Sequence, residues 1–325
     1  MMRMAIEGVG VVGSFGNGLE ALTESARVVL CGGALVPAAG QADTEPLKEH
    51  MPARALRRVD HFTRLTLLAA FSALADAGLT PADLTEAGIV LATGYGPARL
   101  TFDFLDSIID HGPEMASPLA FSHSVHNIPA ATVALTMQVT GPCTTVSQFE
   151  TSVGAALLTA RSWLAEGRVA RVLVGAADEQ TRFLQLASAA VAAGMDAARS
   201  GGRRRLPVGD GAVFLSLHAD PGRARRGFIA DVDFNETAPT KLPECPVFLS
   251  GAAGPARRTA CGDTVHDLSR VYGNLPVAMA FDIAIASQAV ACSLQPVIAP
   301  VGTIRCESRD RFGNTASVAV TGGSA

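Results

Sequence analysis

The stretch TGPCTTVSQFETSVGAALLTARSWLAEG, residues 140–167, joins a short β-type run to a helix of small apolar residues. Thr144 to Ser147 predict the strand, and Glu150 stands at the junction with no other charge before Arg161. Ser147 and Glu150 fit the S-x-x-E capping box, in which the serine caps a helix and the acid bonds back to its amide. An acid in a first helical turn is also favoured by the helix dipole. The alternative is that Glu150 lies in a catalytic or binding site, whose nature other parts of the sequence must indicate.

The composition favours a large, closely packed α/β protein. Of 325 residues, 48% are hydrophobic and 17% are charged, which is enough to bury a substantial core in one large domain or two fused halves. A net charge of −4 excludes an overall basic field for nucleic acid. No apolar run approaches the roughly 20 residues that span a bilayer, so we expect no membrane insertion. The apolar N-terminus is typical of a first strand and not of a signal peptide.

Six cysteines are scattered through the chain without CxxC spacing. This spacing predicts neither a disulfide framework nor a zinc site, and it fits a reducing cytoplasm best.

Strands and helices alternate along the whole sequence. Apolar runs predict strands at 4–13, 87–96, 168–179, 211–220, 228–236, 246–252, 297–308 and 315–322. Helical spacing or long apolar character predicts helices at 19–29, 63–79, 127–141 and 274–293. Such alternation indicates parallel sheets covered on both faces. The basic RARRG segment, 223–227, suggests two halves, 1–225 and 226–325, in one compact unit with the second half shorter.

Three weaker motifs have ordinary explanations. GVGVVG, 8–13, matches a dinucleotide-binding pattern, but the turn is prolonged and no acid follows at the expected distance. SHSVHN, 122–127, lacks a third metal ligand, so local hydrogen bonding is favoured. We therefore predict neither a cofactor nor a metal. The basic runs at 203–205 and 223–226 are typical of solvated loops, and docking of an acidic carrier partner is the alternative.

Several stretches, in order from residue 5 to residue 320, resemble segments of β-ketoacyl synthases. They are GVGVVGSFGNGLEAL, RVDHFTRLTLLAAFSALADAGL, VLATGYG, FSHSVHNIPAATVAL, RVLVGAADE, VGDGAVFLSL, YGNLPVAMAFDIAIA and RFGNTASVAV. The resemblance implies a thiolase-type αβαβα sandwich of two pseudo-twofold-related halves. Members of this family condense an acyl thioester with a malonyl unit on acyl carrier protein, using one cysteine and two histidines.

The resemblance places all three of those chemical positions on other residue types. The family cysteine falls nine residues after the glycine of a Gly-Pro pair, which is Glu150 when counted from Gly141. The first histidine position falls on Ser250 and the second on Asn274. A carboxylate lacks the nucleophilicity of a thiolate, and Cys143 lies on the strand rather than at its end. The resemblance therefore implies that no catalytic triad is intact.

Such substitutions resemble the chain length factors of type II polyketide synthases, which are inactive ketosynthase-like subunits. The resemblance implies a heterodimer with an active ketosynthase, whose acyl tunnel this chain shapes, and the YGNLPVAMAF segment favours a polyene-like or highly reduced product. In this fold the strand before the nucleophile pairs with its mate across the dimer. The expected interface residues on or next to that strand are Cys143, Thr145, Ser147 and Phe149. The expected tunnel residues are Phe102, Phe104, Leu119 and Phe121, for which ordinary core packing is the alternative.

Two other functions remain open from the sequence. The chain could decarboxylate malonyl-acyl carrier protein to supply primer units, although ketosynthase-like domains that do so keep their histidines. It could also be an unrelated scaffold on the same fold. The segment between DVDFNE and PVFLSG is short where active enzymes have a helix, which agrees with the loss of a full substrate pocket.

Overall fold

The computed structural model describes residues 2–35, 40–194, 206–235, 245–251, 265–292, 302–310 and 312–323. Its strands form one continuous order, β4-β3-β5-β6-β1-β7-β11-β10-β8-β9, with the short β2 added to β1. The first half supplies β1 (Met4–Gly13), β2 (Gly16–Asn17), β3 (Gly88–Thr93), β4 (Cys143–Ser147), β5 (Arg171–Asp178) and β6 (Gly211–His218). The second half supplies β7 (Phe228–Asn235), β8 (Val247–Gly251), β9 (Val265–His266), β10 (Thr303–Arg309) and β11 (Thr315–Thr321).

The two runs of strands repeat one topology. Outward from the β1–β7 junction, the first run is β1-β6-β5-β3-β4 and the second is β7-β11-β10-β8-β9. In each run the first two strand pairings are antiparallel and the last two are parallel. Equivalent strands thus occupy equivalent places, as a pseudo-twofold repeat requires.

Two buried helices lie between the first run of strands and the second run of strands. The first, α7 (Ser152–Ala165), contacts β3 and β5 of one run and β7 and β11 of the other. The second, α10 (Ala278–Cys292), contacts β8, β10 and β11 and also β1 and β6. Gly154 of α7 allows the close approach, because an added Cβ would lie 2.8 Å from the Cβ of Ala316. The main apolar core fills this layer.

The outer face of the first sheet is covered by α3 (His61–Ala77) and α6 (Ile128–Met137). Gly10 of β1 permits the contact, since a Cβ there would lie 2.0 Å from the carbonyl oxygen of Ala69. Gly8 and Gly10 of GVGVVG therefore serve helix packing, whereas Gly13 makes room for the Phe15 ring. Asp60 caps α3 by accepting from the Thr63 amide, and Gly78 ends the helix in the left-handed conformation.

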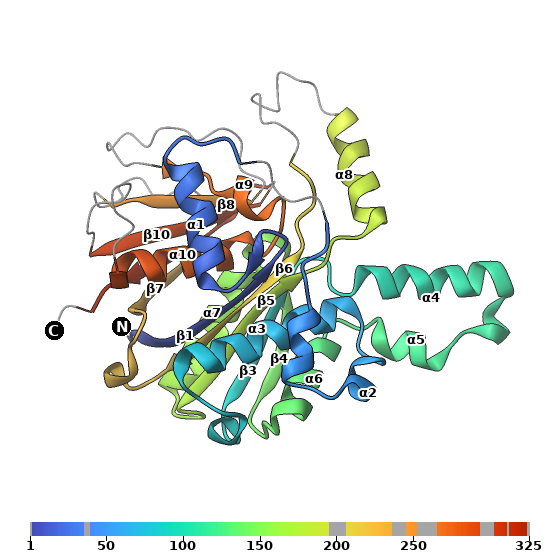
Figure 1. Ribbon diagram of the computed structural model, residues 1–325, viewed down its shortest axis with the longest axis horizontal. Helices are drawn as coiled ribbons and strands as arrows, with labels where there is room; N and C mark the ends of the chain where they lie inside the picture. Colours follow the sequence, from blue (N-terminus) through green and yellow to red (C-terminus); the bar gives the residue numbers. More distant parts are fainter. Residues whose placement is uncertain are drawn as a thin grey trace.

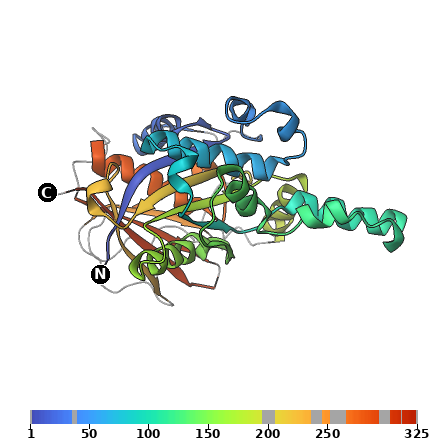
Figure 2. The same ribbon diagram turned by 90° about the horizontal axis from the view of Figure 1, so that it is seen from below.

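A helical arm projects from this layered body (Figures 1 and 2). It consists of α4 (Ala98–His111), η3 (Pro113–Met115) and α5 (Pro118–His123), and α4 packs along α5. The sequence analysis did not predict the arm, nor α8 (Arg182–Gly194) near its base. The remaining elements are α1 (Leu19–Leu30), η1 (Glu45–Glu49), α2 (Ala53–Leu56), η2 (Pro81–Leu84), η4 (Phe149–Thr151), η5 (Pro221–Arg223) and α9 (Ser269–Tyr272).

The predicted alternation of strands and helices is confirmed where the structure describes it. The predicted parallel sheets are wrong in part, because β1, β6 and β5, and likewise β7, β11 and β10, pair antiparallel. The predicted strand at 297–308 begins at Thr303, and the segment 236–244, where a helix is missing from the sequence pattern, lies outside the described residues. The basic run 203–205 also lies outside them. Among the helices described, none has both the length and the apolar character needed to cross a bilayer.

Candidate functional site

Glu150 occupies a sharp turn between the edge strand β4 and the buried helix α7. Phe149, immediately before it, has a left-handed backbone with φ of 48°. The turn is fixed from both sides: the Gln148 amide donates to Ser152 Oγ (2.7 Å), and Thr151 Oγ1 donates to the Gln148 carbonyl (2.9 Å). Ser147 belongs to the strand and bonds weakly to the Gly94 carbonyl, at 3.4 Å. The capping-box prediction is therefore wrong, because Ser152 and not Ser147 satisfies the turn.

The surroundings of Glu150 are aromatic and acidic. The Tyr95 ring lies edge-on to the Phe149 ring, with centroids 6.0 Å apart. Burial raises the pKa of the Tyr95 hydroxyl, and the negative charges of Asp178 and Glu150 raise it further. Glu150 is thus close enough to Tyr95 for its charge to act on the phenol.

Asp178, at the end of β5, holds the loop that faces this turn. Its carboxylate is fully buried and accepts from Thr93 Oγ1 (2.8 Å), the Gly94 amide (3.0 Å) and the Tyr95 amide (2.9 Å). Burial raises the pKa of Asp178 to about 6, and these hydrogen bonds oppose the rise. Asp178 therefore fixes Tyr95 against the Glu150 turn, a role that the sequence analysis missed.

Ser250 lies at the carboxyl end of β8, opposite Ser308 of β10. Its hydroxyl donates to the Glu307 carbonyl at 3.3 Å. The neighbouring Asp282 is fully buried on α10 and accepts from Tyr272 Oη at 2.8 Å. Burial raises the pKa of Asp282 to about 8, against the opposing hydrogen bond of Tyr272. At neutral pH this part of the site holds an uncharged carboxyl and two hydroxyls.

Asn274 is held by its backbone in the turn between α9 and α10. Its amide donates to the Pro207 carbonyl (2.9 Å), and its carbonyl accepts from the Gly209 amide (3.1 Å). Its side chain is exposed. Pro276, two residues on, packs against Gly94, where an added Cβ would lie 2.3 Å from the Pro276 Cβ.

These contacts bring the three predicted positions to one end of the sheets. The Gly94–Tyr95 loop touches the Glu150 turn on one side and the Asn274–Pro276 turn on the other. The η4 turn also contacts β10, the strand that pairs with β8 next to Ser250. Glu150, Ser250 and Asn274 therefore surround the carboxyl ends of parallel strands from both halves, the place where α/β folds carry their sites.

The four predicted tunnel residues all lie on the arm. Phe102 packs on Phe183 of α8, with ring centroids 3.8 Å apart, and Phe104 packs on Phe121 at 5.5 Å. Leu119 and Phe121 are 70% and 56% exposed. Ordinary core packing, the alternative explanation for these residues, does not hold for Leu119 and Phe121.

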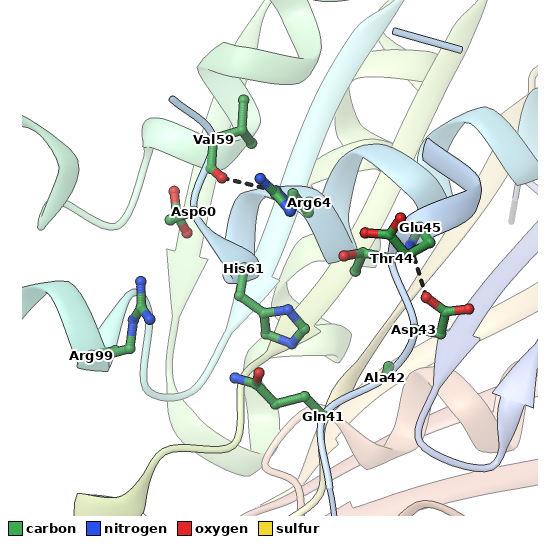
Figure 3. A pocket seen from close by; sticks show the side chains of 10 residues that line it. All are labelled: Gln41, Ala42, Asp43, Thr44, Glu45, Val59, Asp60, His61, Arg64 and Arg99. Atoms are coloured by element: carbon green, nitrogen blue, oxygen red, sulfur yellow. Dashed lines mark hydrogen bonds between the residues drawn. The ribbon is translucent and has the colours of Figure 1, made fainter. Parts of the chain in front are cut away.

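A second polar cluster, which the sequence did not predict, lies beside a cavity of about 410 Å³, and its His61, Ala42 and Arg99 line that cavity (Figure 3). His61 Nε2 lies 2.8 Å from Asp210 Oδ2, and Asp210 also accepts from the Ala42 amide at 2.7 Å. Glu179 accepts from the Arg99 amide at the start of α4 (3.1 Å), and burial raises the pKa of Glu179 to about 7. These hydrogen bonds show a structural role for the cluster: Asp210 holds α3 through His61, and Glu179 holds the start of α4 through the Arg99 amide.

The SHSVHN segment, 122–127, is not part of a metal-type cluster among the described residues. Within the described ranges no group of three or more His, Cys, Asp or Glu side chains could hold a metal ion. The ring of His126 lies over Gly96, where an added Cβ would be 2.5 Å from the ring. In the basic run 223–226, Arg226 pairs with Asp76 and donates to Gln288, so this arginine is tied to the body of the fold.

The β-ketoacyl synthase N-terminal domain, as a family model, matches residues 35–206, which is more than half of the sequence. The chain belongs to the β-ketoacyl synthase family. It is 27% identical over 213 residues to polyketide beta-ketoacyl synthase 2 of Streptomyces virginiae, covering 65% of this chain and 50% of that protein. It is 31% identical over 194 residues to polyketide beta-ketoacyl synthase 1 of Streptomyces halstedii, covering 54% and 46%. The chain thus spans about half the length of these two ketosynthase relatives.

Solved structures of ketosynthases share the fold over nearly the whole chain. The AntDE:AntF complex of a type II polyketide synthase acyl-carrier protein with its ketosynthase superposes with a TM-score of 0.80 and 15% identity, covering 99% of this chain and 100% of that one. The ishigamide ketosynthase/chain length factor gives 0.74 and 18%, with the same coverage. A β-ketoacyl synthase from Burkholderia phymatum gives 0.77 and 15%, with complete coverage of both chains. The predicted thiolase-type fold is confirmed.

Proposed function

We propose that this β-ketoacyl synthase family member is a non-catalytic chain length factor of type II polyketide biosynthesis. It forms a heterodimer with an active ketosynthase and shapes the tunnel that receives the growing acyl chain. The observation that carries the proposal is the turn after β4, which presents Glu150 beside Tyr95 and the buried Asp178 where the family places its cysteine.

The chemistry of the three positions supports a loss of condensing activity. A carboxylate beside a second carboxyl and a phenol has no thiolate to accept an acyl group. Ser250 and the neutral Asp282 replace the imidazole of the first histidine position, and an exposed Asn274 replaces the second. Loss of all members of a catalytic set removes the chemistry-specific part of the rate.

The open edge of the first sheet supports a partner of the same fold. Strand β4 is the last strand of the order, and its residues are exposed or half-buried. An uncharged, β-prone edge such as CTTVS is a template for strand addition and needs cover. The ishigamide structure is described as a ketosynthase/chain length factor, and we assign the cover in this protein to an active ketosynthase. An acyl carrier protein would deliver substrate to that complex.

The arm supplies the surface that would enter the partner's tunnel. Its large apolar side chains remain exposed in the single chain, and they include Leu105, Ile109, Met115, Leu119 and Phe121. Exposed apolar patches of this kind mark interaction sites. The decisive experiment is co-expression with an active ketosynthase of a type II polyketide synthase from the same organism. Co-purification of the two chains and a product length that depends on this chain are expected, and purification of each chain alone would overturn the proposal.

Truncating Phe104 is expected to lengthen the product. Phe104 packs on Phe121, so Phe104→Ala removes one ring of this aromatic pair. The space that the ring filled then stays open, because neighbouring side chains do not move in to fill it. The co-expressed complex should then make a polyketide longer by roughly one or two two-carbon units, as measured by mass spectrometry. Val28→Ala, at an exposed site on α1, is the control. An unchanged product from Phe104→Ala would remove this residue from the tunnel.

Changing Glu150 is expected to leave the function intact. Glu150→Gln should keep the heterodimer assembled, with condensing activity within roughly twofold of the original, because the residue fills a site without performing chemistry. Glu150→Cys should not create condensing activity in the isolated chain, because Ser250 and Asn274 do not supply imidazoles. Covalent acyl loading is measured by intact-mass spectrometry. Loading and elongation by the isolated Glu150→Cys chain would contradict the assignment.

Carbon dioxide release from malonyl-acyl carrier protein tests the enzymatic alternative. The chain purified alone is expected to release none above background. Release that Glu150→Gln abolishes would replace the structural role with primer formation by decarboxylation.

A further inference from the structure

Phe149 is held in an unfavourable backbone conformation at the end of the open edge strand. Its φ of 48° is one of two left-handed values among the non-glycine residues that the structure describes. A bulky residue in this region is an outlier that persists only when its surroundings impose it.

The hydrogen bonds of the turn impose that conformation on Phe149. The Thr151 side chain and amide both donate to the Gln148 carbonyl, at 2.9 and 3.1 Å. Ser152 Oγ accepts from the Gln148 amide and also lies 2.7 Å from the Phe149 carbonyl. The peptide groups on both sides of Phe149 are therefore pinned, and the backbone cannot relax.

The consequence of this conformation is that an aromatic ring points out of the molecule. Phe149 is 56% exposed, and its described ring contact is the edge-on one with Tyr95. The loop bearing Tyr95 is in turn fixed by the buried Asp178. The ring is thus presented on a rigid support, which lowers the entropy lost when a partner binds it.

The position of Phe149 is continuous with the open β4 edge. If β4 pairs antiparallel with the matching strand of the partner in full overlap, the chain beyond Ser147 runs past the start of the partner's strand. Phe149 then lies against the segment that leads into that strand. Rigid aromatic side chains at the centre of an interface are the usual hot spots of binding.

We propose that Phe149 is the anchor by which this chain docks on its ketosynthase partner, with its ring entering a pocket beside the partner's edge strand. This inference rests on the proposed heterodimer. It adds a residue that determines affinity, next to the retired nucleophile position, and a reason for the left-handed turn.

Two variants separate anchoring from a structural role. Phe149→Ala removes the ring and keeps the strained backbone, while Phe149→Gly removes the ring and relieves the strain. Both are expected to weaken binding to the co-expressed ketosynthase roughly 30-fold, measured by isothermal titration calorimetry. The isolated Phe149→Gly chain should melt about 2 °C above the Phe149→Ala chain. A structural role would instead lower the melting temperature of both variants.

Two controls complete the experiment. Gln138→Gly relieves the other left-handed residue, at the end of α6, and should leave affinity unchanged. Val28→Ala removes exposed apolar atoms from α1 and should do the same. If both Phe149 variants bind with wild-type affinity, the proposal that Phe149 is the anchor is wrong, while the proposed heterodimer is unaffected. Failure of the wild-type chain to bind any ketosynthase overturns the heterodimer itself, and a self-dimer that Phe149→Ala disrupts overturns the choice of partner.

Discussion

Ser147→Lys is expected to separate the chain from the proposed ketosynthase partner while leaving the chain folded. Ser147 is exposed at the last position of the edge strand, and its described contact is a weak one to the Gly94 carbonyl. A lysine there costs the isolated chain little, since natural edge strands carry lysine to block strand addition. In the heterodimer the same ammonium would be buried without a partner charge. An uncompensated buried charge of this kind should raise the Kd roughly 100-fold or more.

Size-exclusion chromatography of the co-expressed pair measures this effect directly. The Ser147→Lys chain should elute apart from the ketosynthase, with a melting temperature close to that of the original chain. Val28→Lys is the matched control, because it places the same charge on an exposed apolar site of α1, away from the open edge strand in the sequence and in the fold order. Co-elution of the Ser147→Lys chain with the ketosynthase would show that the β4 edge is not the interface.

The layered body of the fold could be predicted because its buried strands are almost continuous apolar runs. Residues of β3 alternate between the two cores, with Ile89 and Leu91 against α3 and α6, and Val90 and Ala92 against α7. Both faces are covered, so the run is apolar at every position. Gly78 gave a reliable helix end, because the left-handed C-cap is a local requirement of the backbone.

The arm could not be predicted in the same way. Its helix α4 projects from the body, and its apolar residues contact other exposed elements such as α5 and α8 instead of the core. The resemblance pointed to Phe102 and Phe104, but neither composition nor periodicity indicated that they would stand on a projecting helix pair.

The buried carboxyls were missed for a different reason. Asp178 and Asp282 each end or interrupt an apolar run, and in a sequence such acids are typical of a surface position. Their burial depends on distant contacts, since Asp178 binds a loop about 85 residues earlier in the chain and Asp282 is enclosed by Tyr272 and Ser250. The capping-box prediction at Ser147 failed because β4 extends through that residue.

Asp282 gives the chain a stability that falls as the pH rises. Its folded pKa of about 8 lies above the ordinary 3.8 because the carboxyl is fully buried. A carboxyl with a raised folded pKa contributes most below its unfolded pKa, and that contribution is lost as the pH rises through the folded value. Between pH 5 and pH 8 this loss is roughly 4 kcal/mol, at about 1.4 kcal/mol for each pH unit. The raised pKa values of Asp178 and Glu179 act in the same direction.

Asp282→Asn is therefore expected to flatten the pH dependence of unfolding. The amide oxygen can still accept from Tyr272 Oη, and the side chain no longer pays for ionisation in the core. Urea titrations at pH 5 and pH 8 should show the free energy of unfolding of Asp282→Asn falling by roughly 4 kcal/mol less than that of the original chain. Asp310→Asn is the control, because Asp310 is only partly buried and hydrogen bonds from Asn314 and its neighbours lower its pKa despite that burial. It should leave the slope between pH 5 and pH 8 unchanged. Parallel profiles for Asp282→Asn and the original chain would mean that Asp282 is ionised at neutral pH, and the site beside Ser250 would then hold a charge instead of a neutral carboxyl.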